Sequence, residues 1–116
     1  MSEQNTLELS MERVDANGNP QPFNVTMNWS DFPGASTTVF DATVKAVKEN
    51  LAYMDANYGY GSGWGINSVG SYGPGDGYCW QVQIDDKSTS NDAGLDSLAV
   101  TRATGNHKIT FSRVKA

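Results

Sequence analysis

Apolar and polar residues alternate along three segments of the chain, and each alternation predicts a half-buried β-strand. Residues 7–11 and 23–29 flank the hairpin signal Asn17-Gly18, so we expect them to pair as an antiparallel hairpin. Residues 80–84 alternate as clearly, and a closing strand is expected over residues 109–114. The pattern therefore predicts a sheet built from both ends of the chain.

A helical period replaces the alternation after the break at Phe32-Pro33-Gly34. Apolar residues then recur at steps of four and three, the spacing of one helix face, at Phe40, Val44, Val47, Leu51 and Met54. Thr38 and Asp41 fit a capping box, so the pattern predicts a helix over residues 38–55. The order of elements predicts a single domain over residues 1–116 with an α+β fold: a β-grasp-like mixed sheet with one helix packed across it.

Residues 57–80 combine glycine with tyrosine and tryptophan. Glycine lets a backbone approach a partner closely, while Tyr and Trp supply large flat surfaces with a polar handle. Residues 64–70 fit a short strand and residues 72–77 fit a loop. We interpret residues 58–76 as a contact loop, and since it holds no catalytic motif it favours binding over a reaction.

Charge and hydropathy narrow the class of partner. The 116 residues carry a net charge of −5, which lacks the basic footprint of a nucleic-acid-binding protein. The chain contains no run of about 18 apolar residues, so the sequence predicts no transmembrane helix. The N-terminal sequence MSEQNTLELS lacks the charged and apolar regions of a signal peptide, which leaves two alternatives: a cytoplasmic protein, or a fragment separated from its leader.

Residues that carry chemistry are few and scattered. The chain has no GxSxG, HExxH or P-loop motif, so we expect neither an enzyme nor a covalently bound cofactor. His107, the only histidine, is expected in an exposed turn, and no metal site is expected around it. Cys79, the only cysteine, is expected as a half-buried strand thiol. The acidic residues Asp85, Asp86 and Asp92 do not have the spacing of a calcium loop.

The aromatic residues divide by their phase. Trp29 and Trp80 are in phase with apolar strand neighbours, which favours core packing, and we expect Trp80 to pack against the helix. Tyr60, Trp64 and Tyr72 lie among glycines outside any apolar period. For these three, packing and ligand contact both stay open.

Several short segments, taken in order, resemble a known family. They are Thr38-Val39-Phe40-Asp41-Ala42, Gly65-Ile66-Asn67-Ser68-Val69-Gly70, Tyr78-Cys79-Trp80-Gln81-Val82, Gly94-Leu95-Asp96-Ser97-Leu98 and Thr104-Gly105-Asn106-His107-Lys108-Ile109-Thr110-Phe111. Together they resemble the C-terminal β-domain of the cobalamin carriers transcobalamin and intrinsic factor, and related bacterial domains, over residues 7–114. The chain departs from the family where Asn106 replaces an aspartate and Leu98 stands near a usual tyrosine. The carriers' α-helical domain, which supplies much of their cobalamin site, has no counterpart in these residues.

The resemblance implies a non-enzymatic module that binds cobalamin or a related corrinoid, in a secreted or cell-surface protein. The contacts it implies are Trp64, Asn67, Tyr72, Trp80, Gln81, Asn91 and Asp92. The aromatic residues would pack on the flat corrin, and the amides would meet its side-chain amides. The alternative is a structural or adhesive module of a bacterial surface protein that binds protein or glycan.

Overall fold

The computed structural model describes residues 6–32, 34, 36–50, 53–60, 63–89, 94–95, 98–101 and 106–115; for residues 57–60, 63 and 101 it describes the backbone alone. Asn91 and Asp92, two of the contacts that the resemblance implies, lie outside these described residues. So does Leu51 of the predicted helix face.

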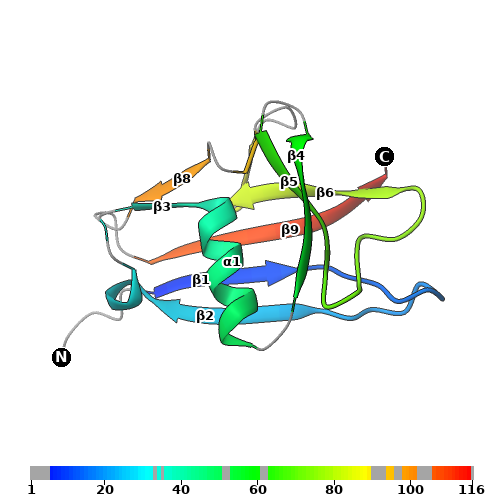
Figure 1. Cartoon of the computed structure of the whole chain (residues 1–116), viewed down its shortest axis with the longest axis horizontal. Helices are drawn as coiled ribbons and strands as arrows, with labels where there is room; N and C mark the ends of the chain where they lie inside the picture. Colours follow the sequence, from blue (N-terminus) through cyan, green and yellow to red (C-terminus); the bar gives the residue numbers. More distant parts are fainter. Residues whose placement is uncertain are drawn as a thin grey trace.

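A five-stranded mixed sheet forms one layer of the fold (Figure 1). Its strands lie in the order β2-β1-β9-β6-β7. They are β1 (Thr6–Met11), β2 (Phe23–Asn28), β6 (Tyr78–Ile84), β7 (Lys87–Ser88) and β9 (His107–Lys115). The central pair, β1 and β9, is parallel, and the other neighbours are antiparallel. The predicted hairpin, the mixed sheet and the α+β class are thus confirmed.

A single α-helix among the described residues, α1 (Val39–Glu49), crosses one face of this sheet (Figure 1). Thr38 caps it as predicted, because its Oγ1 accepts a hydrogen bond from the Asp41 amide at 3.1 Å. The prediction that the helix continues to residue 55 is wrong. Asn50 already leaves helical geometry, and Met54 begins a strand.

Two small ribbons complete the fold. β4 (Met54–Tyr60) pairs with β5 (Gly63–Val69), and β3 (Ser36–Thr38) pairs with β8 (Ala99–Thr101), both antiparallel. A short 3-10 helix, η1 (Trp29–Asp31), follows β2. The strand predicted within residues 64–70 is therefore confirmed, but the interpretation of residues 58–60 as loop is wrong, since they pair with β5.

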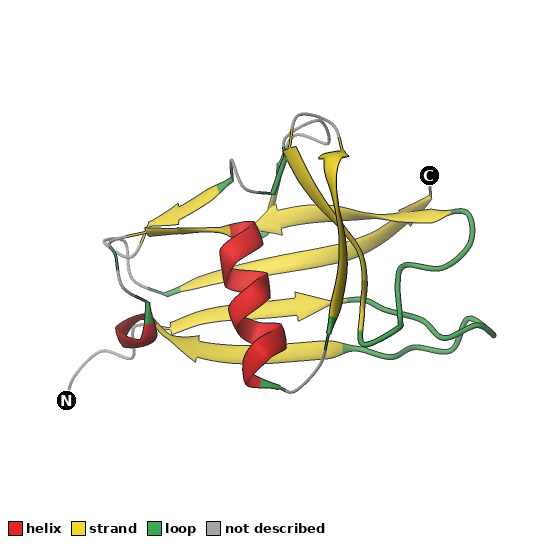
Figure 2. Ribbon diagram, viewed as in Figure 1, coloured by secondary structure: helices red, strands yellow, loops and turns green. Residues whose placement is uncertain are grey.

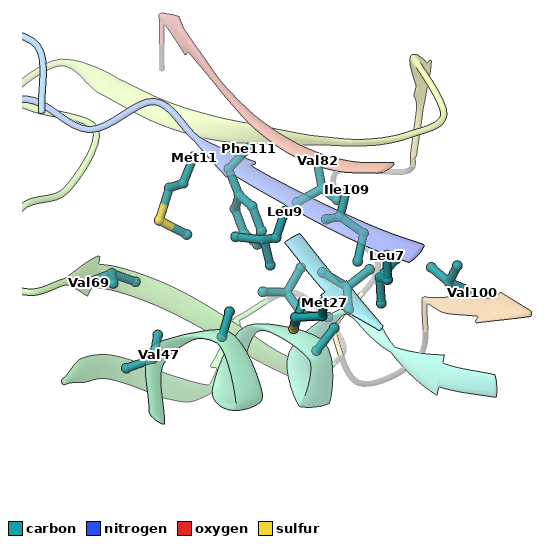
Figure 3. Packing of buried hydrophobic residues seen from close by; sticks show 14 of the residues in the cluster. Leu7, Leu9, Met11, Met27, Val47, Val69, Val82, Val100, Ile109 and Phe111 are labelled. Atoms are coloured by element: carbon teal, nitrogen blue, oxygen red, sulfur yellow. The ribbon is translucent and has the colours of Figure 1, made fainter. Parts of the chain in front are cut away.

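The core lies between the sheet and the layer that contains α1 and the β4–β5 ribbon (Figure 3). One alternate set of strand residues points into it, as the alternation predicts: Leu7, Leu9, Met11, Met27, Val82, Ile109 and Phe111. Trp29 is fully buried, which confirms its predicted core position. The opposite sheet face carries polar side chains, among them Ser10, Thr26, Gln83, Thr110 and Ser112.

Candidate functional site

Trp64 is packed inside the fold rather than presented on a loop. Its ring stacks on Phe40 of α1, with ring centroids 5.2 Å apart and an interplanar angle of 30°. Its carbonyl oxygen accepts a hydrogen bond from the Leu95 amide at 2.8 Å. The Phe40 contact places Trp64 beside α1, where a ligand would meet at most part of the half-buried ring.

Tyr72 lies beyond the far end of the same strand. The backbone of Tyr72 bridges to Val69, the last residue of β5, whereas Trp64 stands at the strand's start. Val69 lies five residue steps along the strand from Trp64, a distance of roughly 17 Å at the usual rise. Asn67 lies between them, exposed, with its amide 3.5 Å from an Asp55 carboxylate oxygen. The structure therefore does not bring Trp64 and Tyr72 to one place.

Trp80 and Gln81 lie on opposite faces of β6, because neighbouring strand residues alternate. Trp80 turns toward the core side. Its ring packs edge-on against Phe111 at 5.6 Å, and its Nε1 donates to the Glu12 carbonyl oxygen at 2.6 Å. These two contacts join Trp80 to β9 and to the residue after β1, and its ring also packs against the core cluster to which α1 contributes. Gln81 lies on the uncovered polar face, where its Nε2 donates to the Thr89 carbonyl oxygen at 3.0 Å.

Two long connections lie at one end of the sheet (Figure 2). A concave region lies between them. The residue 12–22 connection of the first hairpin forms one wall, and residues 71–78 form the other. We call this region the loop-end hollow. It has two adjoining parts of about 370 and 630 Å³, which share Val14, Gly18 and Arg113. Of the implied contacts that lie among the described residues, Tyr72 lines the hollow.

Gly73 lets the second wall approach strand β5, and Gly75 lets it approach the first wall. A Cβ on Gly73 would lie 2.7 Å from the Asn67 carbonyl oxygen, and one on Gly75 would lie 2.8 Å from a Val14 methyl. Gly75 also adopts φ +96°, which side-chain-bearing residues rarely do. These two glycines thus serve close approaches within the chain, Gly73 to a strand and Gly75 to the other connection.

Two arginines, which the sequence analysis did not single out, organise the loop-end hollow. Arg13 donates from Nε to the Gln21 carbonyl oxygen at 2.8 Å and from Nη1 to that of Val69 at 2.5 Å. Its guanidinium also lies over the rings of Phe23 and Tyr72, at 5.1 and 5.4 Å. Partial burial lowers the pKa of Arg13, and Tyr72 partly offsets this, but an arginine stays charged at any physiological pH.

Arg113 holds the other wall. Its Nε donates to the Pro74 carbonyl oxygen at 2.6 Å, and its guanidinium lies 3.8 Å from the centroid of the Tyr78 ring. Its backbone amide donates to Glu12 Oε1 at 2.6 Å. No carboxylate of the described residues lies within 4.0 Å of the Arg13 or Arg113 guanidinium.

A signal for both arginines was present in the sequence. Arg13 continues the buried alternation of β1 by two residues, and Arg113 extends that of β9 in the same way. A charged residue in phase with a buried strand face must find hydrogen-bond partners where the core ends. Here the partners are backbone carbonyls and aromatic faces of the two connections.

The acidic residues near the loop-end hollow have different tasks. Asp15 fixes the hairpin turn by accepting from the amides of Asn17 and Asn19, both at 2.9 Å. The Asn19 backbone hydrogen bond is the main reason that the pKa of Asp15 lies below its ordinary value. Asp76 also lines the larger part, without an ion pair among the described residues.

His107 differs from its predicted exposed turn. It begins β9, its side chain is 14% exposed, and its ring meets Trp29 edge-on at 6.5 Å. Its Nδ1 contacts Asp85 Oδ2, and the other Asp85 oxygen accepts from the Lys108 amide at 2.9 Å. The pair joins two strand ends and does not line the loop-end hollow. Cys79 is a half-buried free thiol on β6, as predicted.

Comparison of the chain with protein-family models found no match, and comparison with curated proteins found none. Among the described residues, no helix has the length and apolar character needed to cross a membrane.

Proposed function

We propose that the chain is a non-enzymatic binding module with a β-grasp fold. Support for the fold comes from the sheet order β2-β1-β9-β6, in which the first and last strands are parallel neighbours at the centre and α1 covers one face. In β-grasp domains a hairpin, a helix and further strands follow one another in this way. The order of elements along the chain agrees with this assignment.

We propose cobalamin or a related corrinoid as the ligand, bound at the loop-end hollow of a secreted or cell-surface protein. The observation that carries the binding role is the hollow itself, whose larger part of about 630 Å³ lies within the size range of small-molecule sites. It is lined by Tyr72 and Tyr78, by glycine backbone and by the Arg113 guanidinium. A corrinoid is larger than this volume, so one edge of it would enter while the rest stayed outside.

Calorimetric titration with cyanocobalamin tests this proposal. We expect a heat of binding that saturates, with a dissociation constant of about 1 mM or lower. A dissociation constant of about 1 mM corresponds to roughly 4 kcal/mol of binding free energy. Tyr72→Ala should weaken binding, because it removes an aromatic wall of the larger part. Trp64→Ala is the matched control: it removes a larger aromatic ring that does not line the loop-end hollow.

Two results would count against it. Absence of heat at millimolar cyanocobalamin removes the corrinoid as ligand of this chain. Equal loss of affinity in folded Tyr72→Ala and Trp64→Ala variants moves the site away from the loop-end hollow.

A structural or adhesive module is the second candidate, favoured by the open edge of the sheet. β2 pairs with β1 alone in the described sheet, and its exposed residues Asn24, Thr26 and Asn28 are polar. Such an edge offers unpaired backbone groups to a protein partner, and polar side chains to a glycan. Glycan or protein binding that Thr26→Glu abolishes and Tyr72→Ala preserves would favour this candidate over the corrinoid.

A further inference from the structure

We propose that Arg113 forms an oxyanion subsite in the loop-end hollow, and that the group it takes is the carboxylate of a hexuronic acid or a closely similar sugar acid. The inference rests on the proposed binding role of the loop-end hollow and adds a second class of ligand, distinct from the corrinoid. It concerns the four Nη hydrogens of Arg113, which the fold leaves available.

The fold holds this guanidinium in place without using its terminal donors. Nε is taken by the Pro74 carbonyl oxygen at 2.6 Å, and one face of the guanidinium lies 3.8 Å from the Tyr78 centroid. The Nη atoms have no hydrogen-bond acceptor among the described residues. Nη2 would lie 3.3 Å from a Cβ on Gly75, which places this end of the side chain against the glycine backbone of the second wall.

A fixed guanidinium with free Nη hydrogens is suited to a planar oxyanion. The Nη donors form a rigid fork that matches the two oxygens of a carboxylate. Since the Tyr78 ring and Pro74 already restrict the side chain, binding costs little further rotamer entropy. Arg113 also borders both parts of the loop-end hollow, so a bound anion would reach either one.

The surrounding charges restrict the ligand to a single anionic group with hydroxyls around it. Asp15 and Asp76 line the larger part, and the whole chain carries a net charge of −5, so a polyanion would be repelled. The same carboxylates accept hydrogen bonds from hydroxyl donors. Tyr72 and Tyr78 add ring surface of the kind that lies against a sugar. A sugar acid combines the one carboxylate with the hydroxyls.

The test is a titration of the ¹⁵N-labelled chain with D-glucuronate, compared with D-glucose and with inorganic phosphate at the same ionic strength. We expect glucuronate to shift the Arg113 Nε–H signal and the amides of residues 72–78, and to bind at least about tenfold more tightly than glucose, as the loss of a charged hydrogen-bond pair requires. Arg113→Gln should abolish this preference. Arg113→Lys, which keeps the charge without the fork, should lose about tenfold.

Lys108→Gln is the matched control, since it removes one exposed cation from the opposite end of the same strand and should leave binding unchanged. Equal affinity for glucose and glucuronate overturns the inference, as does phosphate binding as tight as that of glucuronate. So does unchanged glucuronate binding by Arg113→Gln. The Arg113 Nε–H signal of the unmodified chain keeps the test valid even where a variant fails to fold.

Parallel titration with cyanocobalamin separates this inference from the proposed ligand. Corrinoid binding without glucuronate binding overturns the oxyanion subsite and leaves the corrinoid proposal standing. Glucuronate binding at Arg113 without corrinoid binding supports the subsite and removes the corrinoid.

Discussion

Replacement of Trp80 should weaken the fold at the place where β1, β9 and β6 meet. Its Nε1 donates to the Glu12 carbonyl oxygen at 2.6 Å, and its ring packs on Phe111 at 5.6 Å. Trp80→Phe keeps an aromatic ring but removes the donor, at a cost of about 1 kcal/mol for one neutral hydrogen bond. Trp80→Ala also removes the ring; a fully buried Trp→Ala change costs about 3–5 kcal/mol, and for this half-buried ring we expect roughly 2–3 kcal/mol.

Urea unfolding followed by far-UV circular dichroism measures both changes. With a denaturant dependence of roughly 1.5 kcal/mol per molar urea, Trp80→Phe should lower the midpoint by about 0.7 M and Trp80→Ala by about 1.3–2 M. Val114→Ala, on the neighbouring strand and facing away from the core, should change the midpoint by less than about 0.3 M.

The outcome distinguishes a packing residue from a ligand contact. If Trp80→Ala unfolds at the midpoint of the unmodified chain, the ring contributes nothing to packing and our assignment of Trp80 is refuted. Loss of ligand binding at unchanged stability would restore Trp80 to the binding surface.

Three further changes test local parts of the structure. Gly75→Ala should lower the thermal unfolding midpoint more than Gly18→Ala. Both residues have positive φ, which costs about 1–2 kcal/mol for alanine, but only at Gly75 would the new methyl meet another side chain, at 2.8 Å. Equal losses of stability would refute this close approach. Burial raises the pKa of Asp85, but hydrogen bonds, that of His107 foremost, outweigh it and hold the pKa below its ordinary value. The stability gained is complete above the unfolded-state pKa of about 3.9 and is lost as the pH falls through the lowered folded pKa. Between pH 6 and 2, the unfolding free energy of Asp85→Asn should therefore fall less steeply than that of the unmodified chain. Parallel pH profiles of the two would contradict this. Thr38→Ala should lower the unfolding free energy by about 1 kcal/mol, and Thr38→Ser should leave it almost unchanged. If neither change alters the unfolding free energy, the cap does not stabilise the helix.

The sequence predicts the central sheet well because its strands are covered on one face. A strand buried on one side and polar on the other must alternate, and Leu7, Leu9 and Met11 do so, as do Ile109 and Phe111. Hydroxyl capping is equally local, so the helix start at Thr38 is readable from four residues. These signals depend on near neighbours in the chain.

The β4–β5 ribbon gives no such signal. Its first strand, MDANYGY, has no alternation and includes a glycine, and its pairing with β5 carries two register shifts. Residues of this kind become a strand because of what they pair with rather than through their own propensity. For the same reason the apolar spacing from Val47 to Met54 predicts a continuing helix, although Met54 packs against the core from a strand.

The candidate site was the least predictable part. The sequence singles out Tyr72 through its glycine-rich surroundings, whereas no motif or composition signal marks Arg13 or Arg113. Their backbone partners, the carbonyls of Gln21, Val69 and Pro74, come from connections whose folding no local pattern reveals. A loop-end site therefore appears only when both connections are placed together.

The most direct test of the account is a map of ligand contacts on the unmodified chain. During titration of the ¹⁵N-labelled chain with cyanocobalamin, we expect the largest shifts at Tyr72, Gly75 and the Arg113 side chain, with little change at Trp64 and Phe40. Shifts centred on Trp64 and Phe40, or the absence of any shift up to about millimolar ligand, would contradict binding at the loop-end hollow.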